Sequence, residues 1–340
     1  MIFMQIDDSK YGSRNKRGDW KPYKLSSNIP FFDWPFSITK NLKWLLGIPG
    51  YIVPWTFFYG LIAVILWVYF TPAIETLKNF HFNWFFYLLI RNLIITIICA
   101  GGLHFFLYIK KTQGNSFKFN AKGMEKNNKN FYFKDQTLDN IFWTLCSGVP
   151  IWTAYEAFSL WAFANGYFLG LEWNMHPIYL GLTFLFLPLF REVHFYFVHR
   201  LLHIPLLYNF SHYIHHKNVN PGPWSGIAMH WFEHILYFSG TLIHFIIPAH
   251  PVHAVFQLLH AGIGPLFHGH IGFEKIQIGK IGIDTHSHAH YLHHKYFECN
   301  YADGAIPLDK FFGTFHNGSD ESQEKMVERY KIRMKKMRST

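Results

Sequence analysis

The chain has 340 residues, of which 50% are hydrophobic and 20% aromatic, while only 15% are charged. That is more apolar material than a soluble core of this size requires, so the composition indicates an integral membrane protein. Lysine and arginine outnumber aspartate and glutamate by 31 to 21, which gives a net charge of +10. Because no basic stripe or nucleic-acid-reading motif accompanies the charge, we assign it to loops beside anionic lipid and expect no nucleic-acid partner.

Residues 1–43 form a basic N-terminal segment that contains no apolar run followed by a cleavage site, so it is not a signal peptide. The three cysteines are Cys99, Cys146 and Cys299. They are scattered, and two of them lie inside apolar runs. We therefore expect neither a disulfide framework nor a thiolate metal site.

Residues 44–198 are predicted to be a transmembrane region, since a helix needs about 20 apolar residues to cross the hydrocarbon core. Four spans meet that length: Trp44–Phe70, Phe82–Ile109, Leu138–Ala164 and Pro177–Val198. The connector at 110–134 holds seven lysines, whereas 71–81 and 165–176 share a single one. By the positive-inside rule, the N-terminus, this connector and everything after Arg200 face the cytoplasm.

Two further apolar stretches, 235–247 and 252–267, are short for a crossing and are interrupted by histidine and proline. We expect a re-entrant or interfacial helical pair there, which leaves the later histidines cytoplasmic. Residues 319–340 form a charged tail, expected to be a solvated helix. The predicted fold is thus an all-α, multi-pass membrane protein with about four transmembrane helices. Its catalytic domain, residues 199–318, is expected to form a cytoplasmic helical cap.

Twenty of the 23 histidines lie at or after His194. Eight of them have helical spacing, one H-x-x-x-H and two H-x-x-H-H patterns: His199, His203, His212, His215, His216, His290, His293 and His294. Positions i, i+3 and i+4 share one helix face, so each pattern should aim its imidazoles at one point. Neutral imidazole binds iron, zinc, copper or nickel, and eight nitrogens are too many for one ion. The sequence therefore predicts a binuclear metal site.

Isolated histidines on apolar faces are usually core residues, and we assign eight of them that role: His81, His104, His176, His244, His250, His253, His260 and His316. Arg91 lies inside the second predicted span and Glu156 inside the third. Charged groups at such depth usually pair, so we expect an Arg91–Glu156 ion pair with a structural role.

The histidine patterns carry a resemblance. "HRLLH" at 199–203, "HYIHH" at 212–216, and "HYLHH" followed by "NYADGAIPLDKFFGTF" resemble the three histidine boxes and terminal signature of the sterol desaturase and fatty acid hydroxylase superfamily. The segments "GIAMHWFEH" and "HGHIGFE" resemble family segments between the second and third boxes. The likeness covers about residues 192–315. It is closest to the sterol C5-desaturase type.

The resemblance implies a membrane di-iron oxygenase, with the eight box histidines as ligands and further ligands between the second and third boxes. His270 is the first choice there and His230 the second, with His234, His268 and His286 in reserve. Glu274 is expected to orient a ligand imidazole rather than bind metal. Asn300 and Asp309, in the terminal signature, are expected to hold the third box in place.

The implied reaction is O2-dependent hydroxylation or desaturation of a sterol, fatty acyl or other long alkyl substrate, on two iron ions for which zinc can substitute. Attack on an unactivated C–H bond exceeds what side-chain acids and bases achieve, and no other catalytic motif is present. Electrons would come from an external cytochrome b5, ferredoxin or reductase, since the chain has no flavin, haem or nicotinamide motif. The membrane would be the endoplasmic reticulum in a eukaryote or the inner membrane in a bacterium.

A second function class stays open at this point. Histidine clusters in a membrane protein also occur in metal-binding or metal-transport proteins. A transporter would move zinc or iron across vesicles without O2, whereas an oxygenase would hold two metals and consume O2 with a reductant and lipid.

Overall fold

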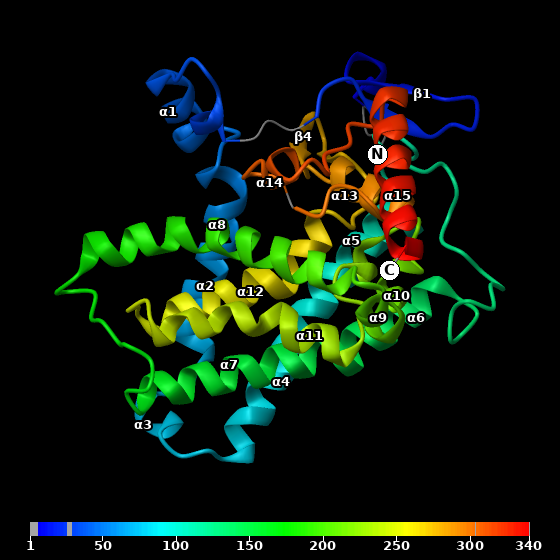
Figure 1. Cartoon of the computed structure of the whole chain (residues 1–340). Helices are drawn as coiled ribbons and strands as arrows, with labels where there is room; N and C mark the ends of the chain where they lie inside the picture. The colour runs from blue at the N-terminus through cyan, green and yellow to red at the C-terminus, as the bar shows by residue number, and fades with distance from the viewer. Residues whose placement is uncertain (1–5, 26–28, 303, 340) are drawn as a thin grey trace.

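The computed structural model of the chain describes residues 6–25, 29–302 and 304–339. Most of these residues are helical, as the composition predicts (Figure 1). Within the described ranges, strands occur only in two short antiparallel hairpins: β1 (Gly12–Arg14) with β2 (Trp20–Pro22), and β3 (Lys275–Ile278) with β4 (Ile281–Asp284).

The first half of the chain is a series of helices joined in places by π-helical turns. They are α1 (Ile38–Leu46), η3 (Ile52–Thr56), α2 (Phe57–Phe70), α3 (Ile74–Leu77), α4 (Phe82–Thr96), η4 (Ile97–Gly101), α5 (Gly102–His104), η5 (Phe105–Ile109), α6 (Gln136–Trp143), η6 (Thr144–Gly148), α7 (Val149–Ala164) and α8 (Pro177–Leu202). Within the described residues, three helical segments are long and apolar enough to cross a membrane: Ile52–Phe70, Phe82–Ile109 and Pro177–Leu202.

The expectation of four spans is therefore supported for three. The segment 138–164 is helical through α6, η6 and α7, but it is less apolar than the other three. It carries Thr153, Glu156 and Ser159, which are all buried inside the protein. The first span also begins later than expected, at Ile52, because Trp44 belongs to α1 and a non-helical stretch with two glycines and a proline follows it.

Glu156 explains how polar side chains are accommodated at that depth. Its carboxylate forms an ion pair with Arg91 of α4, and its other oxygen accepts a hydrogen bond from Asn92 Nδ2 at 2.9 Å. Arg91 also donates to Phe70 O at 3.0 Å. The predicted Arg91–Glu156 pair is confirmed, and it fastens α4 to α7.

The predicted helical pair after α8 is present as helices, but its second member is a core element. It comprises α11 (Trp231–Phe238), η9 (Ser239–Phe245) and α12 (Pro251–Phe267). Nearly every side chain of α12 is buried, and the helix packs against α2, α7 and α8. The burial of α12 disfavours the interfacial alternative and leaves the re-entrant one as a prediction.

The histidine-rich region lies at one end of this helical unit (Figure 1). Its elements are α9 (Pro205–Leu207), η7 (Tyr208–His212), α10 (Tyr213–His216), η8 (Pro223–Ser225), α13 (His288–Tyr296), α14 (Leu308–Phe311) and α15 (Asp320–Ser339). The last helix confirms the predicted helical tail. Two N-terminal 3-10 turns, η1 (Asp8–Lys10) and η2 (Pro30–Phe32), complete the described elements.

The basic N-terminal segment and the lysine-rich connector fold over this region. Phe119 N donates to Gly272 O at 3.1 Å, and Trp20 N donates to Phe119 O at 3.1 Å. Trp20, Phe117 and Phe119 form a small buried cluster with Tyr291 and Leu292 of α13. Two segments distant in sequence thus brace the helix that carries the third histidine box.

Candidate metal centre

Nine buried or partly buried histidines form two adjoining groups. The ligand atoms in each group lie within 4.8 Å of one another. The first group, of five, is His199, His203, His212, His216 and His293; the second, of four, is His215, His270, His290 and His294. The ring centroids of His216 and His294, one from each group, are 5.0 Å apart. All eight box histidines and His270 are therefore brought together.

Each H-x-x-H-H box is divided between the two groups, which differs from the expectation that one box aims at one point. In the second box His212 and His216 join the first group, and His215 turns to the second. In the third box His290 and His294 join the second group and His293 the first. Residues i and i+4 share a side, whereas residue i+3 lies far enough around the helix to reach the neighbouring group.

Within each group the Nε2 atoms face one another. His203 Nε2 lies 3.2 Å from both His212 Nε2 and His216 Nε2, and His293 Nε2 lies 3.1 Å from His216 Nε2. In the second group His270 Nε2 lies 3.1 Å from His215 Nε2 and 3.0 Å from His294 Nε2. A proton on one nitrogen of a pair could form a hydrogen bond to the other nitrogen. Protons could not satisfy all of the converging lone pairs at once, whereas a bound metal cation can.

Hydrogen bonds from the other ring nitrogen to backbone carbonyls aim two imidazoles of the first group. His199 Nδ1 is 2.8 Å from Tyr301 O, and His293 Nδ1 is 2.6 Å from Cys299 O. A carbonyl can only accept, so each Nδ1 carries the proton and each Nε2 presents its lone pair to the cluster. Among the described residues, buried His199 Nε2 has no hydrogen-bond partner, as expected of an atom reserved for a metal.

Burial keeps these rings neutral. It lowers the pKa of His293 to about 3 and lowers the pKa values of His215, His216, His290 and His294 well below the usual range, with the neighbouring histidines adding to the effect. A neutral imidazole is the form that binds metal, so the donor set fits transition-metal ions.

His270 reaches the second group from a loop, since residues 269–274 are not helical. Gly269 and Gly272 have φ angles of 75° and 82°, a region that favours glycine. A Cβ on Gly272 would lie 2.2 Å from Tyr108 Oη, so the loop can pass that side chain only with glycine there. The tight turn explains how a histidine outside the three boxes enters the cluster.

Glu274 is therefore not on a shared helical face with His270. It is buried just before β3, its Oε2 has no hydrogen-bond partner within the described chain, and burial raises its pKa to about 8. No cluster histidine is among its described hydrogen-bond partners. A role in orienting a ligand imidazole stays a prediction that the contacts do not support.

Asn300 and Asp309 lie where the terminal signature is expected to act. Asn300 Nδ2 donates to Ala289 O of α13 at 3.0 Å and to His316 O at 2.8 Å. Asp309 accepts from Tyr301 N at 2.9 Å and from Ala302 N at 2.8 Å. Because Tyr301 O accepts the proton of His199 Nδ1, Asp309 holds the carbonyl that aims this histidine.

His230 is not brought into either group. It caps the N-terminus of α11, where its Nδ1 accepts from Phe232 N, and its ring packs on Phe210 and Trp231. The reserve positions are also outside the groups. His234 contacts Ser147 Oγ and Ile227 O, His268 Nδ1 contacts Thr285 O, and His286 lies in the loop before α13.

Glu233 is a site residue that sequence reasoning missed. Its Oε1 lies 2.7 Å from His212 Nδ1, and both side chains are buried. A carboxylate in this position fixes the imidazole tautomer and strengthens it as a ligand. The sequence does mark Glu233, because an acidic residue in the apolar run 231–238 needs a partner if it is buried.

Comparisons with known proteins point to the same part of the chain as the histidine groups. Residues 184–314 match the fatty acid hydroxylase family model, a span that contains all nine histidines. This region matches that family model, and the match covers less than half of the chain. The chain is 27% identical over 146 residues to the Delta(7)-sterol 5(6)-desaturase ERG3B of Gibberella zeae, covering 40% of this chain and 42% of that protein.

The Delta(7)-sterol 5(6)-desaturase erg3C of Aspergillus fumigatus is 26% identical over 166 residues, which cover 42% of this chain and 51% of that protein. The chain thus spans about half the length of the curated relatives it matches. No solved structure matches the chain.

Proposed function

We propose that the protein is a membrane di-iron oxygenase that hydroxylates or desaturates a lipid, using O2 and electrons from an external carrier. The observation that carries this proposal is the pair of adjoining histidine groups, in which nine Nε2 or equivalent nitrogens converge inside a fatty acid hydroxylase family region. His199, His203, His212, His216 and His293 would hold one ion, and His215, His270, His290 and His294 the other.

Iron bound there would supply the activation of O2 and the oxidation of a C–H bond, chemistry that no side chain provides. Hydroxylation would convert R–H, O2, two electrons and two protons into R–OH and water. Desaturation would remove two hydrogens from neighbouring carbons and form two waters from the same O2, electrons and protons. The electrons would come from a cytochrome b5, a ferredoxin or a reductase that docks from the cytoplasm.

The chain's own residues orient the site and keep it dry. Tyr301 O, Cys299 O and the Glu233 carboxylate fix three imidazoles, so little reorganisation is needed when metal binds. Eight of the nine histidines are buried, which limits access of water to the reacting centre.

The orientation in the membrane is part of this proposal. The lysine-rich connector 110–134 and the N-terminal segment fold onto the histidine region, so these basic segments lie on the same side as the site. The positive-inside rule then makes that side cytoplasmic.

The decisive experiment is lipid analysis of a host with and without the gene, combined with metal analysis of the purified protein. We expect a lipid that differs by one added oxygen atom or two lost hydrogens, and about two irons per chain, as the two groups require. Metal flux into vesicles without O2 consumption would instead support a metal transporter and refute the oxygenase.

A further inference from the structure

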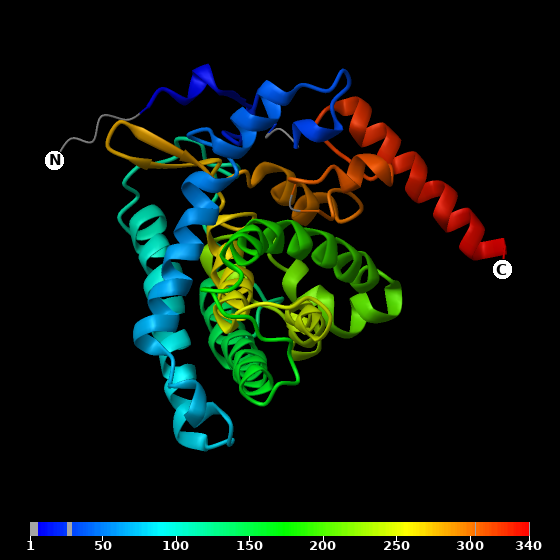
Figure 2. The ribbon, with the colours of Figure 1, turned by 90° about the vertical axis from the view of Figure 1, so that its left-hand side faces the viewer.

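The helix α1 is not the start of the first membrane span, although the sequence predicts that this span reaches back to Trp44. In the structure α1 ends at Leu46, and the helical segment that is long enough to cross a membrane begins at Ile52. Figure 1 shows α1 beyond the end of α2, on the same side of the molecule as α13 and α14, and Figure 2 shows the same arrangement from the side. The helix therefore lies at the level where the first span would leave the hydrocarbon core.

The side chains of α1 follow the pattern of a helix that lies in a membrane surface. Ile38, Leu42 and Leu45 have the spacing i, i+4, i+7 and share one face, while Lys40 and Lys43 are exposed on the opposite face. The helix has only nine residues, whereas a crossing needs about 20. An amphipathic helix of this kind lies along the interface, with its apolar face about 5–10 Å into the boundary between head groups and acyl chains.

The chain on both sides of α1 is also apolar and exposed. Trp34 is 93% exposed, Ile38 67% and Ile48 84%. Exposed apolar side chains that gather over one segment mark a contact with a membrane or with another protein. Because this segment leads directly into the first span, and because tryptophan is enriched at membrane interfaces, lipid is the partner that fits it.

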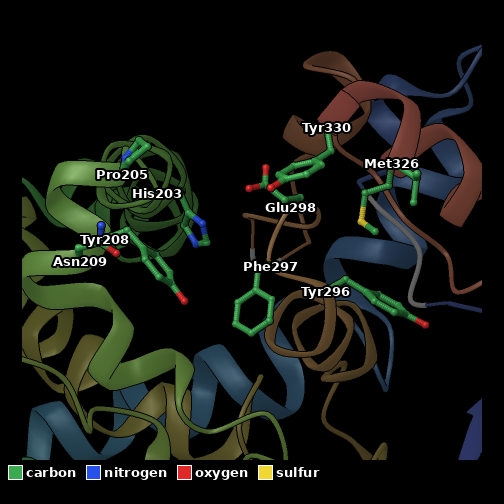
Figure 3. A pocket seen from close by; sticks show the side chains of 10 residues that line it. His203, Pro205, Tyr208, Asn209, Tyr296, Phe297, Glu298, Met326 and Tyr330 are labelled. Atoms are coloured by element: carbon green, nitrogen blue, oxygen red, sulfur yellow. The ribbon is translucent and has the colours of Figure 1, made fainter. Parts of the chain in front are cut away.

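Behind α1 lies an apolar groove of about 470 Å³, bounded by η2, α1 and the middle of α8. Leu42 and Leu45 line it from α1 and Leu189 from α8, and Asn41 is the one polar side chain in its described lining. The groove is separate from the cavity beside the histidine site, which has His203 at its edge (Figure 3). A groove with such a lining suits a hydrocarbon chain.

Contacts with α8 and with the terminal signature hold the segment in place. At its start, Ile29 N donates to Ala305 O at 2.9 Å, and the Phe32 ring packs against a ring of α14. After α1, Tyr51 Oη donates to Leu185 O of α8 at 2.5 Å. The segment is thus fastened on both sides of α1, and the groove has defined walls.

We propose that residues 29–48 form an interfacial anchor on the histidine side of the membrane, and that the apolar face of α1 and the groove behind it take acyl chains of bilayer phospholipids. Lys40 and Lys43 face the head groups, and with Asp33 as the one acidic residue of the segment, the anchor complements anionic lipid. The inference goes beyond the proposed function, since it concerns how the protein sits in the bilayer and not the reaction.

The test measures the depth of spin labels on the two faces of α1. A cysteine replaces Leu42 or Lys40, whose side chains point about 200° apart on a helix. Cys99 and Cys146 are changed to alanine, and Cys299 is kept because it is buried. The full chain is reconstituted into vesicles of phosphatidylcholine and phosphatidylglycerol. Electron paramagnetic resonance then compares collisions of each label with O2, which partitions into hydrocarbon, and with a water-soluble nickel chelate.

We expect the label on Leu42→Cys to meet O2 more often than the chelate, at a depth of about 5–10 Å, and the label on Lys40→Cys to do the reverse. Trp34→Cys is a second exposed apolar position and should behave as Leu42→Cys does. Preference for the chelate on both faces would place α1 in water and overturn the proposal. Poor access of both reagents to Leu42→Cys would also overturn it, because protein, such as a second copy of the chain, would then cover this face.

A fluorescent label tests the groove itself. Leu45→Cys carries a bimane in the groove, and Lys43→Cys carries one on the opposite face as the matched control. Phosphatidylcholine brominated along its acyl chains should quench the label at Leu45→Cys strongly and the label at Lys43→Cys weakly. Equal quenching at the two positions, or no quenching at Leu45→Cys, would refute the acyl chain assigned to the groove. Metal content per chain, measured in every sample, shows that each variant is folded.

Discussion

The two histidine groups are both largely enclosed but are held in different ways. In the first group, hydrogen bonds from Nδ1 to Tyr301 O, Cys299 O and Glu233 Oε1 aim three of the five imidazoles. In the second group, His290 Nδ1 and His294 Nδ1 have no hydrogen-bond partner among the described residues. The His290 ring is positioned instead by packing, with Gly269 directly against it. Hydrogen bonds thus aim most rings of the first group, whereas at least two of the four rings in the second group depend on packing.

This difference predicts unequal affinity. Partners that fix the tautomer and direction of an imidazole typically change metal affinity about 10–100-fold. We expect a chelator to remove metal from the second group before the first, so that an intermediate with about one metal per chain accumulates during dialysis. Single-residue variants test this difference between the two groups.

The largest effect should come from two neighbouring residues that belong to different groups. His293→Ala removes a ligand of the first group and His294→Ala one of the second, and each should lower product formation below about 1%. Metal content per chain, measured by mass spectrometry, should fall by about one ion in each case. His81→Ala is the control and should keep full metal, because His81 lies far away at the start of α4.

Full turnover in either variant would disprove the ligand assignment. Loss of both metals in both variants would show that the groups act as one unit, and the comparison between them would fail. Loss of one metal in each would establish two separable positions.

The histidines that come together could be predicted, but their division between the two groups could not. The spacing of His212, His215 and His216 is visible in the sequence, and the prediction of two ions follows from their number. Which imidazole joins which group depends on how α8, α10 and α13 meet, and no local pattern encodes that. The aiming groups Tyr301 O and Cys299 O are backbone atoms, which side-chain patterns cannot reveal. The sequence ranks His230 second to His270; in the structure His230 caps α11, and a glycine turn brings His270 into the second group.

The helical outline was read well where apolar length alone decides it, as for 82–109 and 177–202. For α12 the sequence leaves two alternatives, re-entrant and interfacial, and only its burial against three helices disfavours the interfacial one. A buried ion pair can be predicted when both charges stand out in apolar runs, as Arg91 and Glu156 do. The partner of Glu233 is His212, which the sequence assigns to the metal site, so this contact is not predicted.

The second prediction removes the hydrogen bond that most clearly distinguishes the first group. Glu233→Gln keeps the shape but replaces the carboxylate that accepts from His212 Nδ1. We expect activity and first-group affinity to fall about 10–100-fold, with the protein still folded and the second group unaffected. Metal titration followed by activity assay checks this. Wild-type affinity in Glu233→Gln would mean that hydrogen bonding does not set the first position.

The third prediction tests whether shape sets the second position. Gly269→Ala adds a Cβ that would lie 3.0 Å from His290 Cδ2, at a residue whose φ of 75° already disfavours a side chain. The ring must shift, so we expect second-group affinity to fall several-fold while the first group keeps its metal. Gly279→Ala is a matched control: its φ is 61° and its Cβ would meet no atom within 4 Å. A similar metal loss in both variants would point to loop strain rather than to the contact with His290.

The smallest effect should come from Glu274, the buried carboxylate that, unlike Glu233, has no described bond to a cluster histidine. Burial raises its pKa from 4.5 to about 8. Between these values the unfolded carboxyl is ionised while the folded one keeps its proton, so the folded state binds more protons and its stability falls as pH rises, by at most about 1.4 kcal/mol per pH unit. Glu274→Gln cannot ionise, so its thermal midpoint should decline less than that of the wild type between about pH 5 and pH 8, with near-normal metal content. Parallel declines in the two proteins would show that Glu274 is already ionised when folded, and a large loss of metal would restore the orienting role that its sequence position suggested.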